Sequence, residues 1–244
     1  MKQRFNTLIR NAKKYRNAAI LFEVFLVAIH IFLSILLVPN RFIRTLFHLD
    51  REFNIPSLFS AAQLFLVGYG FIYLYNRLKG ATADPPRFYR ALGIIFIFLA
   101  LDEGLFLHES ITMLSRNLDW VPKTNTGHGA WVLPYILIGL GFFLWNIRTL
   151  IALLRKHTRE FSTMAVGFFL YILGGLGLET NRWLFRLLNV LPEHQGLIQL
   201  SMEEFFEMIG ITIVLYGLLL LHQSDRSSTT ANTVFDANSP TTQP

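Results

Sequence analysis

The chain has no cysteine among its 244 residues. This absence excludes disulfides, thiol nucleophiles, iron–sulfur clusters held by thiolates and zinc sites with cysteine ligands. Any chemistry that the protein performs must use histidine, carboxylate, hydroxyl or arginine side chains.

Several familiar enzyme signatures are also missing. His108 and Glu109 are followed by "SITM", so they do not form an HExxH zinc motif, and no G-x-S-x-G sequence occurs. The paired Glu-x-x-His repeats of carboxylate di-iron bundles are absent as well. These gaps leave the reaction class open.

Charge is scarce within six long apolar segments. Hydrophobic residues make up 52% of the chain, which contains 23 phenylalanines and has a mean hydropathy of +0.42. Each segment approaches the roughly 20 residues that cross about 30 Å of hydrocarbon. We therefore predict an all-α polytopic membrane protein, a bundle of six transmembrane helices. The predicted spans are 18–38, 56–76, 88–112, 131–153, 162–182 and 197–221.

Lysine and arginine are distributed unevenly between the two sides of this predicted bundle. Fifteen fall in the N-terminal segment, the second and fourth loops and the tail, against seven on the other side. The positive-inside rule then places the N- and C-termini in the cytoplasm, and we expect a bacterial inner membrane. The net charge of +6 follows from this topology, so we expect no nucleic-acid partner.

The sequence predicts one folded domain with two flanking segments. Residues 1–17 form a basic cytoplasmic N-terminal segment, and residues 18–222 form the six-helix transmembrane domain. Residues 223–244 are rich in Ser, Thr, Asn and Pro, and we expect a disordered cytoplasmic tail.

Acidic residues interrupt the apolar pattern near the ends of the third and sixth spans. An ionisable group at bilayer depth costs about 2.5–3.5 kcal/mol, so such residues usually serve a function. Helical periodicity gives each span a carboxylate stripe, and the two stripes lie at matching depths in the outer half. The residues concerned are Asp102, Glu103, His108 and Glu109 in "LDEGLFLHES", and Glu203, Glu204 and Glu207 in "MEEFFEMIG".

The fifth span supplies possible partners for these carboxylates. Three of them recur at helical spacing: Glu179, Arg182 and Arg186. The glycines in "LGGLGLE", just before Glu179, allow close helix packing that would hold Glu179 toward the carboxylates. One alternative is purely structural, with an Arg pairing to Glu103 or Glu204. Elsewhere, Glu23 and His30 of the first span are expected to make hydrogen bonds that pack helices together.

The leading hypothesis is a metal-dependent enzyme that modifies or hydrolyses a membrane lipid. Carboxylates crowded in a low-dielectric pocket require protons or cations, and mixed imidazole and carboxylate ligands suit zinc, iron or manganese. A proton- or cation-coupled transporter and a non-catalytic assembly protein remain open. The expected roles are metal binding by Asp102, His108, Glu109, Glu203 and Glu207, proton transfer by Glu103 and Glu204, and lipid binding by Glu179, Arg182 and Arg186.

Overall fold

A computed structural model describes residues 2–36, 39–49, 51, 53–79, 87–105, 107, 110, 132–178 and 192–237, and this part of the chain is all-helical. The elements are α1 (Lys2–Arg10), α2 (Ala12–Ile35), α3 (Arg41–Leu46), α4 (Ile55–Lys79), α5 (Arg87–Leu105), α7 (Val132–Trp145), α8 (Ile147–Lys156), α9 (Thr158–Ile172), the π-helix η1 (Leu173–Leu178) and α11 (Pro192–Ala237).

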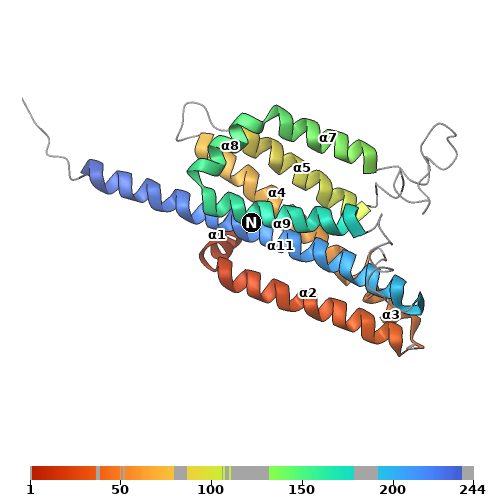
Figure 1. The fold of residues 1–244 in the computed structure, drawn as a ribbon. Coiled ribbons are helices and arrows are strands. Elements are labelled where there is room, and N and C mark those ends of the chain that lie inside the picture. Colours follow the sequence, from red (N-terminus) through yellow and green to blue (C-terminus); the bar gives the residue numbers. More distant parts are fainter. Residues whose placement is uncertain are drawn as a thin grey trace, which may run out of the picture.

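Helix α11 forms the centre of the bundle. It packs along α9 and η1 on one side and along α2 and α4 on the other, and α4 pairs with α5 (Figure 1). Its residues from Ile211 to Leu221 are buried around most of the helix circumference, as expected for a core helix. By contrast, α2 leaves Leu21, Phe25 and Phe32 exposed, which suits a face toward lipid.

Three helices are long and apolar enough to cross a membrane: α2, α4 and the segment His194–Asp225 of α11. A fourth span results if α7 and α8 count as one. The two segments Pro134–Trp145 and Ile147–Lys156 meet at an angle of 66°.

The predicted span 131–153 is therefore not one straight helix. Asn146 stands at the break, and its side-chain amide donates a hydrogen bond to the carbonyl of Phe142 at 2.8 Å. Such side-chain bonds compete with the backbone ladder and bend helices.

The other two predicted spans, 88–112 and 162–182, also differ in form. Helix α5 has 19 residues and carries two charges at each end, whereas α9 has 15 residues before the chain widens into η1. The π-helical turn falls on the glycine-rich "LGGLGL". Glycines have no side chains, so they leave room for the wider backbone of a π-helix.

Both segments that flank the predicted transmembrane domain contain helix where the structure describes them. The N-terminal segment contains α1, which buries Phe5 and Ile9, and α2 begins at Ala12. At the other end, α11 continues to Ala237. Polar contacts extend the packing there, since Gln223 donates to the carbonyl of Ile9 and Arg77 pairs with Asp225. Counting apolar residues alone does not detect such contacts.

Glycines allow α9 and α11 to approach closely. A Cβ added to Gly167 would lie 2.6 Å from the carbonyl oxygen of Gly210, and one added to Gly210 would lie 2.5 Å from the amide nitrogen of Tyr171. Atoms this close are in steric conflict, so neither position accepts a side chain unless the helices separate. Small residues of this kind permit tight helix packing in membranes.

We expect Gly167→Ala to destabilise the protein by about 1–3 kcal/mol, because the new methyl group overpacks the α9–α11 contact. Gly139→Ala on α7 is the matched control, since nothing lies within 4 Å of a Cβ placed there. Replacing Gly by Ala raises helix propensity equally in both variants. The difference between their thermal unfolding midpoints in detergent therefore measures the cost of the steric conflict at Gly167. Equal midpoints would contradict the close approach.

Candidate functional site

The structure describes about half of the residues that the sequence assigns to a site. Asp102 and Glu103 lie in the last turn of α5, and Glu203, Glu204 and Glu207 lie on α11. The others, His108, Glu109, Glu179, Arg182 and Arg186, lie outside the described residues.

Tyr171 of α9 connects the carboxylates of two different helices. Its hydroxyl interacts electrostatically with the carboxyl groups of Glu207, Glu103 and Asp102. The hydroxyl of Tyr135, on α7, lies beside the Asp102 carboxyl. The structure thus brings residues of α5, α7, α9 and α11 into one region. We call this set of five side chains (Asp102, Glu103, Tyr135, Tyr171 and Glu207) the acidic cluster.

Asp102 and Glu207 are therefore near the same hydroxyl group although they lie on different helices. Asp102 is buried, with 6% of its surface exposed, and Glu207 is half-buried. Neither tyrosine was assigned to the site from the sequence, because aromatic residues in apolar spans are common. Linking them to the carboxylates requires knowing which helices are neighbours, and the sequence carries no local signal of that.

Glu207 is positioned by the glycines of η1. A Cβ added to Gly174 would lie 2.7 Å from the Cγ atom of Glu207, and one added to Gly175 would lie 3.1 Å from its Oε1 atom. The Glu207 side chain thus passes directly over two residues that lack side chains. At the end of η1, Gln199 of α11 donates a hydrogen bond to the carbonyl of Leu178 at 2.9 Å. The sequence linked these glycines to Glu179, whereas in the structure they contact Glu207.

The helices around the acidic cluster carry few basic residues near it. Along the described helices, the nearest Lys or Arg on α5 and α9 are Arg90 and Arg159, both at the opposite end of the bundle. Twelve residues separate Arg90 from Asp102, which corresponds to about 18 Å along a helix. Basic residues on the described parts of these two helices therefore do not neutralise the cluster.

Within the described residues, no three His, Asp or Glu side chains are grouped so that they could hold a metal ion. Of the five expected ligands, Asp102, Glu203 and Glu207 belong to this part of the chain, while His108 and Glu109 lie outside it.

A separate polar network joins α2, α4 and α11. The Oε1 atom of Glu23 accepts hydrogen bonds from Gln63 Nε2 at 3.1 Å and from the Thr212 hydroxyl, and all three side chains are at most 1% exposed. The expectation that Glu23 packs helices through hydrogen bonds is confirmed. Gln63 and Thr212 were missed, although each is an isolated polar residue within an apolar span.

Gln63→Leu should destabilise the protein by about 1–3 kcal/mol, because a buried carboxyl group then loses a donor. Gln3→Leu, on the exposed face of α1, is the control and should change stability by less than about 0.5 kcal/mol. Chemical or thermal unfolding in detergent measures both. If the two variants behave alike, the network contributes no stability.

Residues 18–222 match the family described as a domain of unknown function, DUF8692. The match covers most of the chain, so the protein belongs to this family. Among curated proteins and solved structures, none matches the chain.

Proposed function

We propose that this member of the DUF8692 family is a membrane-embedded, metal-dependent enzyme that modifies or hydrolyses a lipid at the acidic cluster. The observation that supports this most directly is the meeting of Asp102, Glu103 and Glu207 around Tyr171. Carboxylates from separate helices repel one another in a low-dielectric site unless protons or cations are bound. A cluster of this kind is costly to maintain, and function is the usual reason for it.

In the proposed site, a zinc, iron or manganese ion is bound by carboxylate and imidazole ligands. The proposed ligands are Asp102, His108, Glu109, Glu203 and Glu207. A bound divalent ion lowers the pKa of a coordinated water or polarises a carbonyl or phosphoryl oxygen. Glu103 and Glu204 would transfer protons. The lipid headgroup would be bound by Glu179, Arg182 and Arg186, with the arginines donating hydrogen bonds to its phosphate oxygens.

The proposed arrangement in the membrane has six spans. Helix α5, with 19 residues, is about 28 Å long, and α9 with η1 contains a further 21 residues (158–178). Both lengths are close to the thickness of the hydrocarbon core. Arg77, Lys79, Arg87 and Arg90 lie at the bundle end opposite the acidic cluster. The positive-inside rule then makes that end and both termini cytoplasmic, in a bacterial inner membrane, with the cluster in the outer half.

A transporter coupled to protons or cations is the second candidate, and the break between α7 and α8 favours it. Discontinuous helices form the binding sites of many secondary transporters, and this pair is bent by 66°. In that case the carboxylates of the cluster would bind and release the coupling ion in turn.

Elemental analysis of purified protein distinguishes these candidates. We expect wild-type protein to carry a divalent metal in stoichiometric amount, and Glu207→Gln or Asp102→Asn to bind it at least about tenfold more weakly. Both substitutions keep side-chain volume, so the thermal unfolding midpoint of the metal-free protein should change little. Glu160→Gln, at the start of α9, is the matched control and should keep the metal.

Two results would contradict the enzyme hypothesis. One is wild-type protein without bound metal after purification free of chelators. The other is proton-driven uptake of a cation into vesicles that Glu207→Gln abolishes, which would support the transporter.

The topology is tested by reporter fusions. A reporter placed after Lys156 and one at the C-terminus should both read cytoplasmic, because the basic residues gather at that end. A reporter after Lys123 should read external. An external signal at either of the first two positions would overturn the six-span arrangement.

A further inference from the structure

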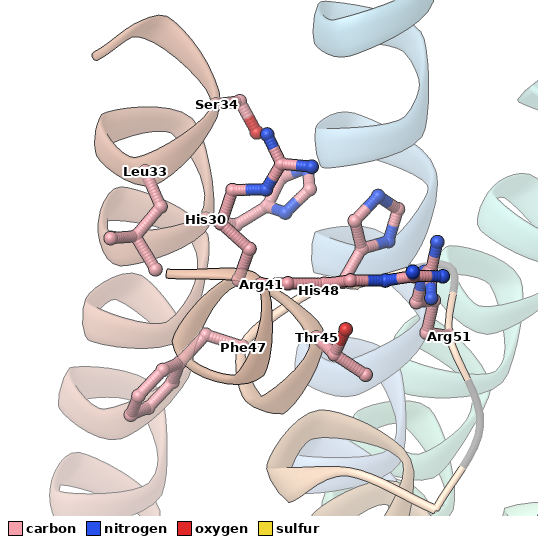
Figure 2. A pocket seen from close by; sticks show the side chains of 9 residues that line it. His30, Leu33, Ser34, Arg41, Thr45, Phe47, His48 and Arg51 are labelled. Carbon is pink, nitrogen blue, oxygen red and sulfur yellow. The ribbon is translucent and has the colours of Figure 1, made fainter. Parts of the chain in front are cut away.

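A second polar site lies between the end of α2 and the segment that follows it. A pocket of about 260 Å³ opens there beside α3, and arginine and histidine side chains line most of its polar surface (Figure 2). The basic side chains are Arg41, Arg44, Arg51, His30 and His48.

Local sequence builds the basic wall of this pocket. Asn40 caps α3 by accepting a hydrogen bond from the amide of Ile43 at 3.2 Å. From that start, Arg41 and Arg44 are three residues apart in α3, which places them on one side of this short helix, and His48 follows just after the helix ends.

Asn54 and Leu49 hold the end of this segment in place. The side-chain amide of Asn54 donates to the carbonyl of His48, and Leu49 is buried in an apolar cluster with Leu26 and Met208. The arginine side chains are exposed, while the backbone just after them packs against α2 and α11.

His30 shows what kind of ligand the pocket prefers. It is only 3% exposed, and its Nδ1 atom accepts a hydrogen bond from the amide of Leu49 at 3.4 Å. An imidazole that accepts at Nδ1 carries its proton on Nε2. Among the described residues, nothing hydrogen-bonds this Nε2 atom. A buried polar atom without a partner at the wall of a basic pocket favours a polar ligand.

The charge of the pocket indicates an anion. Its described lining contains three arginines and no carboxylate, and Ser34 and Thr45 add hydroxyl groups. Asp50 and Glu52, which flank Arg51 in the sequence, lie outside the described residues. Arginine binds phosphate oxygens through paired hydrogen bonds, and no other side chain does so as well. The volume lies just below the roughly 300–1,000 Å³ of small-molecule sites, so a small polar group fits.

Apolar residues beside the pocket indicate that this phosphate belongs to a lipid. Phe42, on the other side of α3, is 73% exposed, and Ile43 is 38% exposed. Phe53 is also 73% exposed, and its backbone adopts a φ of 52°, which is uncommon for a residue other than glycine. A short helix with arginines on one side and exposed aromatic residues on the other suits the boundary between headgroups and acyl chains.

We propose that this pocket binds the phosphate of an anionic lipid headgroup, with Arg41, Arg44 and Arg51 contacting its oxygens and His30 lining the inner wall. The site lies at the same end of the bundle as the acidic cluster (Figure 1). It consists of different residues, so it does not depend on the proposed enzymatic function.

The test compares lipid binding by full-length variants in a neutral detergent. The probes are phosphatidic acid, phosphatidylcholine and inorganic phosphate, and native mass spectrometry or a thermal shift measures the affinity of each. Wild-type protein should bind phosphatidic acid at least about tenfold more tightly than either other probe. The triple variant R41Q/R44Q/R51Q should lose this preference. R148Q/R155Q/R159Q removes three exposed arginines elsewhere and should retain it.

A second variant distinguishes a lipid from free phosphate. F42S/I43S removes the neighbouring apolar contacts, so it should weaken the binding of phosphatidic acid while leaving that of inorganic phosphate unchanged. The proposal is overturned if R41Q/R44Q/R51Q binds phosphatidic acid as wild type does, or if both triple variants lose it equally. It is also overturned if inorganic phosphate binds as tightly as the lipid, since the pocket would then serve a soluble anion.

Discussion

The close contact between α9 and α11 determines the geometry of the rest of the bundle. Gly167 and Gly210 let the two backbones meet, and further along the same contact Gly174 and Gly175 lie beneath Glu207. If side chains separated these helices, Glu207 would move away from Tyr171, and with it from the carboxylates of α5. Close packing and the position of an ionisable group are thus consequences of the same small residues.

Buried polar residues have two different settings in this protein. The Oε1 atom of Glu23 accepts hydrogen bonds from two other helices, so this carboxyl group takes part in the packing. Asp102, Glu103 and Glu207 instead share an electrostatic interaction with one tyrosine hydroxyl, that of Tyr171. The first setting joins three helices through hydrogen bonds between side chains. The second brings carboxyl groups of two helices to one tyrosine hydroxyl, which is the pattern that the proposed function rests on.

The sequence was a good guide to the helical class and to the long apolar helices, because apolar periodicity reports burial in membrane or core directly. From helical rise alone it predicted that Asp102 and Glu207 lie at similar depth. It could not show that both carboxyl groups interact with the Tyr171 hydroxyl, because helix neighbours depend on packing that a single sequence does not encode locally. The break at Asn146 was missed for a related reason, since a particular hydrogen bond accompanies it.

The central position of α11 has a consequence for biosynthesis. Thr212 follows Glu23 by 189 residues, so at about 5–20 residues per second the Glu23 carboxyl is made about 10–40 s before this partner exists. Gln63 is only 40 residues away and is available much sooner. During translation α2 and α4 are therefore made well before α11, and the contacts of Gln63 with α2 are available before those of Thr212. Helix α11 then completes the core, because it is the element against which α2, α4 and α9 all pack.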